Sequence, residues 1–250
     1  MSSRAGVACV LVAALAAWGC DDPKPPAPAP TATEAPVTEA PKPAAPKGPP
    51  TLFVDDSGAS IGENRIDLTQ PEGLPKLKAT IDEKKSLLEG IVPTLGVDRK
   101  AKLTHVGALL DALASAGVKR ALVRTTTRTD FPGELHFVPL AAASKPAPCS
   151  VIGMITEDRG SAVWKVTGGA AGKRGKGMAG PDLTLTGETV ERLSKNCDSK
   201  TFFVSAAQGV EWGLAYDLAA STKSLPKTSF TDYVLIPEKA VPGHALDIAK

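Results

Sequence analysis

The stretch Ile91–Thr125, IVPTLGVDRKAKLTHVGALLDALASAGVKRALVRT, decides the fold that the sequence predicts. Ile91–Val97 is apolar and partly β-branched, which is typical of a buried strand. Thr104 can cap a helix. The inner face of that helix, at spacings of three and four, would be Val106, Leu109, Leu110 and Leu113. Gly117 stands where a left-handed helix stop is expected, and Val118–Val123 resumes as a second strand. The stretch therefore predicts a strand, helix, strand crossover within one sheet.

Four features of this stretch occur together at fixed spacings. Asp98 follows the first strand, Leu103 comes five residues later and Asp111 thirteen residues later, and Ala116-Gly117-Val118 precedes the second strand. This pattern resembles the periplasmic domain of the ExbD/TolR family, the small subunits of proton-driven envelope motors, in which Tyr is usual at the position of Leu103. The resemblance covers about Thr51–Thr125 and implies the element order β, β, α, β, α, β.

The residues before this stretch agree with that order. Thr51–Val54 and Ala59–Ile61 read as strands on either side of a turn, and Ile66 and Leu68 alternate with polar residues as in an edge strand. A helix with one apolar face would follow, its inner positions being Leu74, Leu77 and Ile81. We expect both helices to cover one face of a mixed sheet.

The same order returns after a connector. The expected elements are strands at Val151–Ile155, Ala162–Val166, Thr201–Ala206 and Tyr233–Ile236, a helix with Val190 and Leu193 that Thr186 could cap, and an amphipathic helix over Val210–Ala220. Aligning Asp111 with Asp217 also aligns Gly107 with Gly213. The predicted fold class is therefore α+β, with two ExbD/TolR-like ββαβαβ domains; the alternative is a coincidental α+β order.

The chain divides into six expected segments. These are a signal peptide at 1–19, a lipidated cysteine with a Pro/Ala-rich linker at 20–50, the first domain at 51–130, a connector at 131–148, a second and more divergent domain at 149–240, and a tail at 241–250.

The N-terminus reads as an export signal. Arg4 precedes the apolar run Ala5–Trp18, which is shorter than the roughly 20 residues of a membrane-spanning helix. Ala17-Trp18-Gly19-Cys20 resembles a lipobox, although Leu is commoner than Ala at its first position, so Cys20 would carry the lipid. The alternative is ordinary cleavage near Ala14-Leu15-Ala16, with Cys20 as a free thiol.

The linker contains 11 of the 22 prolines of the chain. Such a composition cannot bury a core and favours extended polyproline geometry, with a reach of about 90 Å. A lipid-anchored domain on this tether could explore much of the periplasm.

Two cysteines remain for the exported domains once Cys9 leaves with the signal peptide and Cys20 is lipidated. Cys149 and Cys197 each precede a predicted strand, and a disulfide between them suits an oxidising compartment. By closing the loop between the two cysteines, it would stabilise the folded state by roughly 3–4 kcal/mol. Metal ligation and free thiols are the alternatives, and two cysteines without a nearby histidine make a poor zinc site.

Two short motifs suggest chemistry. Gly58-Ala59-Ser60-Ile61-Gly62 matches the G-x-S-x-G elbow of hydrolases, but Ser60 falls in a hairpin strand with no helix directly after it, and His105 is expected to be solvated or capping. Gly175–Gly180 satisfies G-x-G-x-x-G without opening a helix, which excludes a dinucleotide site. The basic loop at Lys173–Lys176 could contact an anionic surface or simply be solvated.

Composition and motifs together favour binding over catalysis. The net charge of +2 gives no broad field for nucleic acid. No catalytic grouping or metal cluster is evident, so we expect no enzyme, no cofactor and no metal. The family's proton-carrying membrane helix has no counterpart, since no acidic residue lies between Met1 and Gly19.

The resemblance therefore implies a non-catalytic lipoprotein in the periplasm of a Gram-negative bacterium, on the inner or outer membrane. It would be an accessory to TonB- or Tol-type biopolymer transport. The implied partners are ExbB/TolQ- or TonB/TolA-like proteins, peptidoglycan or a second copy of the chain, bound by residues that the sequence does not identify. The alternatives are a structural lipoprotein that binds peptidoglycan and a hydrolase that uses Ser60.

Overall fold

The computed structural model describes residues 49–250 except 129, 179, 238–239 and 248–250. The described residues belong to one compact unit, Pro46–Lys250. The predicted signal peptide, Cys20 and nearly all of the predicted linker lie outside the described residues.

The first half of the unit contains the elements expected from the sequence, including the edge strand around Ile66, together with one short additional helix. Its elements are β1 (Leu52–Val54), β2 (Gly58–Ile61), β3 (Asn64–Asp67), α1 (Gly73–Glu83), the short α2 (Lys85–Leu88), β4 (Thr94–Val97), α3 (Leu103–Ser115) and β5 (Ala121–Arg124). The strand β4 begins only after Pro93, whose carbonyl accepts the amide of Leu122 in β5. Gly117 has φ +91°, so the predicted left-handed stop of α3 is confirmed.

The second half begins after two connecting elements, β6 (Glu134–Phe137) and the 3-10 turn η1 (Leu140–Ala142). Its elements are β7 (Val151–Ile155), β8 (Ser161–Lys165), β9 (Gly172–Arg174), β10 (Lys176–Gly177), β11 (Gly180–Pro181), α4 (Leu183–Leu193), β12 (Thr201–Ala206), α5 (Trp212–Lys223) and β13 (Asp232–Ile236). The predicted bounds of β7 and β12 are confirmed.

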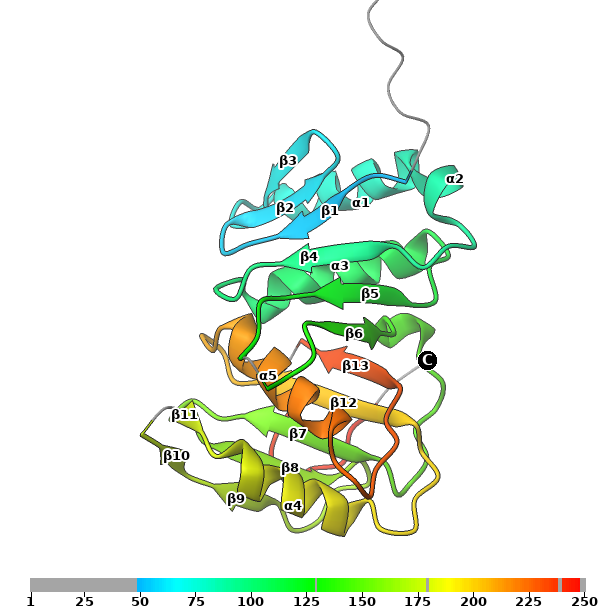
Figure 1. Ribbon diagram of the computed structural model, residues 1–250. Helices are drawn as coiled ribbons and strands as arrows, with labels where there is room; N and C mark the ends of the chain where they lie inside the picture. The colour runs from blue at the N-terminus through cyan, green and yellow to red at the C-terminus, as the bar shows by residue number, and fades with distance from the viewer. Residues whose placement is uncertain (1–48, 129, 179, 238–239, 248–250) are drawn as a thin grey trace, which may run out of the picture. The chain divides into compact units, whose positions relative to one another are not determined.

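One mixed sheet of 11 strands joins the two halves, in the order β3-β2-β1-β4-β5-β6-β13-β12-β7-β8-β9 (Figure 1). The α+β class is therefore confirmed, but the structure is one sheet rather than two separate ones. The connector strand β6 is the link, because it pairs antiparallel with β5 and parallel with β13.

The two halves share one topology. In each half a parallel trio, β1-β4-β5 or β7-β12-β13, is extended by two antiparallel strands to a free edge. Each half is thus βββαβαβ and not the expected ββαβαβ, because β3 and β9 add a third strand before the first long helix.

The expected alignment of Asp111 with Asp217 is wrong by three residues. Val97 and Ala206 end β4 and β12, and Leu103 and Trp212 begin α3 and α5, so equivalent positions differ by 109 residues instead of 106. A shift of three residues is nearly one helical turn, so it still superposes the apolar face of α3 on that of α5. The apolar pattern alone therefore could not reveal that the alignment was shifted.

Most of the core lies on one face of the sheet. Residues of all four long helices, such as Leu77, Leu109, Val190 and Leu218, pack with alternate strand residues from β1 to β8 in one continuous cluster. The expected placement of helices on one face is therefore confirmed. A second cluster, containing Ile152 and Trp164, lies on the other face of the second half only.

Several local predictions were wrong for identifiable reasons. Thr104 and Thr186 do not cap helices: α3 begins at Leu103 without a side-chain cap, and Asp182 caps α4 by accepting the amide of Leu185 at 3.0 Å. Leu74 is exposed although Leu77 and Ile81 are buried. Periodicity locates a helix well, but its first turn is decided by the loop that enters it.

Candidate functional site

The motif around Ser60 does not assemble a nucleophile. Ser60 lies in β2, and its Oγ accepts a hydrogen bond from Arg65 Nη1 at 3.1 Å. Arg65 also donates to Asp55 Oδ1 and to Ser57 Oγ, each at 2.6 Å. The hydrogen bond from Arg65 to the Asp55 carboxylate is the main reason that the pKa of Asp55 falls to about 2. A guanidinium beside Ser60 cannot accept its proton, so this arrangement lacks the base that the elbow chemistry requires.

His105 is buried, so the expectation of a solvated or capping histidine was wrong. Its Nδ1 lies 3.4 Å from the carbonyl oxygen of Asp55. Burial lowers the pKa of His105. We assign this residue to the packing of α3 under the β1–β2 turn.

The disulfide predicted between Cys149 and Cys197 is confirmed, with Cα atoms 5.6 Å apart. It ties the residue before β7 to the α4–β12 loop, and β7 and β12 are neighbours in the sheet. Ser150 Oγ donates to Ser199 Oγ at 2.9 Å beside it, so the start of these two strands is fixed twice.

The residues that carry the family resemblance are spread along the β4–α3–β5 unit. Asp98 follows β4, and its Oδ1 accepts the amide of Lys100 at 2.7 Å. Leu103 is buried at the first position of α3, while Asp111 is exposed on the same helix. The structure does not gather these residues into one site.

The two halves meet through a polar contact that the sequence did not reveal. Arg99, in the β4–α3 loop, donates to both carboxylate oxygens of Asp217 in α5, at 2.9 and 2.7 Å. The indole Nε1 of Trp212 donates to Thr125 Oγ1 at 2.8 Å. A Cβ at Gly213 would lie 2.9 Å from Arg99 Nε, so the glycine makes room for the guanidinium. We interpret this contact as structural.

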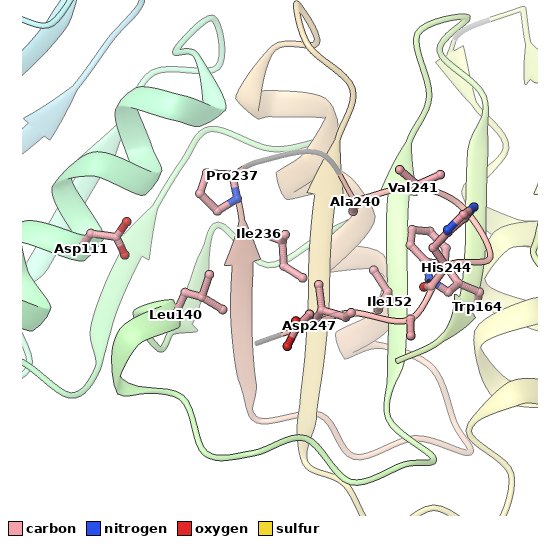
Figure 2. Close-up of a pocket in the computed structure, with 12 residues that line it drawn as sticks. Asp111, Leu140, Ile152, Trp164, Ile236, Pro237, Ala240, Val241, His244 and Asp247 are labelled. Atoms are coloured by element: carbon pink, nitrogen blue, oxygen red, sulfur yellow. Dashed lines mark hydrogen bonds between the residues drawn. The ribbon is translucent and has the colours of Figure 1, made fainter. Parts of the chain in front are cut away.

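A cavity of about 620 Å³ opens beside the second core cluster (Figure 2). Its apolar lining includes Ile152 of β7, Trp164 of β8 and Ile236 of β13. Asp111 reaches it from α3 and Asp247 from the C-terminal segment, as Figure 2 shows. The described lining residues combine this apolar surface with the titratable side chains of Asp111, His244 and Asp247.

One side of this cavity is built from the segment that we expected to be a tail. Residues 240–247 pack across the second half: Leu246 donates its amide to Val166 O at 2.8 Å, and Trp164 Nε1 donates to His244 O at 2.9 Å. The apolar residues Ala240 and Leu246 join the second core cluster. This segment has no periodicity, so sequence patterns could not assign it to a sheet face.

Among the described residues, nothing covers the corresponding face of the first half. Figure 1 shows α1 and α3 behind β1, β4 and β5, with no described element in front of these strands. Phe53 of β1 is 39% exposed there, and its ring crosses Gly96 of β4, where a Cβ would lie 3.0 Å from the ring. We call this surface the open face; Leu122 of β5 also belongs to it and is half-buried.

Within the described part of the chain, no group of three or more His, Cys, Asp or Glu side chains could hold a metal ion. No described helix is long and apolar enough to cross a membrane. No protein family, no curated protein and no solved structure matches this chain.

Proposed function

We propose that this chain is a non-catalytic, lipid-anchored binding protein of the Gram-negative periplasm. It would be an accessory to a TonB- or Tol-type energy-transducing complex, with two ExbD/TolR-like copies fused through one sheet. The repeated strand orders, β3-β2-β1-β4-β5 and β9-β8-β7-β12-β13, support the idea of two copies. The spacing of Asp98, Leu103 and Asp111 supports the family.

The observation that carries the binding role is the difference between the two outer faces. The second half covers its outer face with its own connector and C-terminal segment, and the first half leaves Phe53 exposed on the equivalent strands. An exposed aromatic ring on a flat sheet is a common anchor in protein interfaces. We therefore place the partner on the open face.

The sheet edges are less suitable for a partner strand. β3 has four residues and contains Arg65 and Asp67, and β9 has three and contains Lys173 and Arg174. Short, charged edge strands discourage pairing with another chain. Docking through side chains on the open face is the better hypothesis.

The test is a binding measurement with the chain from residue 21 onward. Titrations would use purified periplasmic domains of the ExbD-, TolR-, TonB- and TolA-like proteins of the same cell, together with isolated peptidoglycan sacculi. We expect one of the protein domains to bind, and Phe53→Ser to weaken binding by at least about tenfold, as for an interface anchor.

Leu74→Ser is the matched control, because Leu74 is an exposed leucine on α1, away from the open face. Binding that both substitutions weaken equally, or no binding to any of these domains, would contradict the proposal. Binding to sacculi alone would favour the structural lipoprotein. No specific contact in the structure favours the hydrolase that uses Ser60.

A further inference from the structure

The second half carries a basic segment, Gly172–Met178, that is separate from the open face and the cavity. It comprises β9, the exposed Gly175, β10 and Met178. β10 pairs with β11 in a two-stranded sheet of its own, outside the main sheet. The segment therefore begins in β9, the edge strand of the main sheet, and its β10 part lies outside that sheet.

The tip of this segment has almost no packing neighbours. A Cβ on Gly175 would meet no atom within 4 Å, and one on Gly177 would meet only the carbonyl of Gly180 at 3.6 Å. Met178 is fully exposed, at 109%, whereas the other exposed large apolar residues of the described chain range from 38% to 56%. Single exposed apolar residues are common on protein surfaces, but moving a fully exposed methionine into an apolar phase is favourable.

The charges on this segment have one sign. Residues 167–181 contain Lys173, Arg174 and Lys176 and no acidic residue. None of the ion pairs among the described residues involves these three cations, and Arg174 donates a 3.4 Å hydrogen bond to Thr189 Oγ1. Arg192 of α4 adds a fourth cation, 3.7 Å from a Cβ placed on Gly172.

Acidic residues also border this group, in the β7–β8 turn, directly after β11 and on α4. Three of them already have partners: Thr156 and Gly160 donate hydrogen bonds to Asp158 and lower its pKa, to which Lys176 adds a smaller effect, the amide of Leu185 donates to Asp182, and Lys227 pairs with Glu191. The segment itself therefore carries a local excess of positive charge from Lys173, Arg174 and Lys176.

We propose that the basic segment rests on an anionic bilayer surface, with Met178 inserted among the lipid headgroups and the cations facing lipid phosphates. Exposed apolar tips flanked by Lys and Arg are characteristic of peripheral membrane contacts, because the apolar group enters the interface and the cations remain at phosphate level. Each basic residue near such a surface strengthens binding by about fivefold. This contact is independent of the partner proposed for the open face.

The experiment is vesicle co-sedimentation of the chain from residue 21 onward, which lacks the lipidated cysteine. The vesicles are pure phosphatidylcholine or phosphatidylcholine mixed with phosphatidylglycerol, at low and at physiological salt. We expect binding to the mixed vesicles only, weakened by salt. The triple variant K173Q/R174Q/K176Q should lower the partition coefficient by on the order of a hundredfold, and Met178→Gln should lower it several-fold while Met178→Leu retains it.

The matched control is K78Q/K85Q/K119Q, which removes the same charge from exposed lysines of the first half. Equal losses in the two triple variants, or equal binding to neutral and mixed vesicles, would overturn the proposal. Binding to soluble polyphosphate as strong as to vesicles, and unaffected by Met178→Gln, would also overturn it by showing a general polyanion site.

Discussion

At the scale of single residues, the contact between Arg99 and Asp217 does most to join the halves. The Asp217 side chain is only 5% exposed, and the Arg99 guanidinium meets both of its oxygens while donating to Thr126 O at 2.7 Å. A bidentate pair of this kind is specific in geometry. Its partners lie 118 residues apart, so no local pattern could show it.

Removing this guanidinium should destabilise the protein. We expect Arg99→Met to lower the free energy of unfolding by about 2–3 kcal/mol, because a buried carboxylate loses its partner although Arg99 itself is a third exposed. Combining it with Asp217→Leu should restore most of the loss. Urea unfolding followed by circular dichroism measures both values.

The control for this prediction is the exposed pair of Lys76 and Glu72, at 3.7 Å. Lys76→Met should change the unfolding free energy by less than about 0.5 kcal/mol. An Arg99→Met variant as stable as the parent would show that the contact is not needed.

At the scale of elements, the strands were easier to predict than the helix ends. Val151–Ile155 and Thr201–Ala206 were located to the residue, because both are mostly apolar, buried runs bounded by polar loops. β9 was missed, because its Gly-Lys-Arg sequence resembles a loop and it becomes a strand only by pairing with β8. Cap and edge positions depend on neighbours that local patterns do not contain.

The disulfide belongs to this scale, since it fixes how β7 and β12 begin. We expect C149S/C197S to lower the free energy of unfolding by about 3–4 kcal/mol, from the entropy of a chain closed over a separation of 48 residues. A reductant should shift the urea midpoint of the parent in the same direction and leave that of the variant unchanged. A parent that is insensitive to complete reduction would contradict this.

At the scale of the whole molecule, the two halves share one core. Phe137 of the connector strand packs against Trp212, Tyr216 and Tyr233, with ring centroids 5.4–6.4 Å apart. These rings belong to the same continuous cluster as Leu52 of β1 and Val163 of β8, which lie in different halves of the sheet. If the contacts between β6 and the second half are lost, residues of both halves therefore lose their packing together.

Unfolding should accordingly be one cooperative transition. In the chain from residue 21 onward the two tryptophans are Trp164 and Trp212, so fluorescence reports on the second half and the junction, while circular dichroism reports on the whole. We expect both signals to give the same urea midpoint. Two separated midpoints would show that the halves are independent domains.

The candidate sites were predictable to different degrees. Cys149 and Cys197 followed from counting cysteines, and Ser60 could be placed in a hairpin strand because turn residues flank that strand on both sides. The exposure of Phe53 was not predicted, because an aromatic residue in a short strand normally faces a core. It faces solvent here because Leu52 and Val54 occupy the buried positions of β1.

The sequence by itself determined the order of the long helices and of the parallel strands, and the buried side of most of them. These properties follow from apolar periodicity and turn residues, which act over a few positions of the chain. Tertiary structure alone decided that β6 joins both halves into one sheet and that residues 240–247 cover only one outer face. Strand pairing and the covering of a sheet face depend on contacts between residues that are distant in the chain. Local sequence patterns contain no information about the free energy of such contacts.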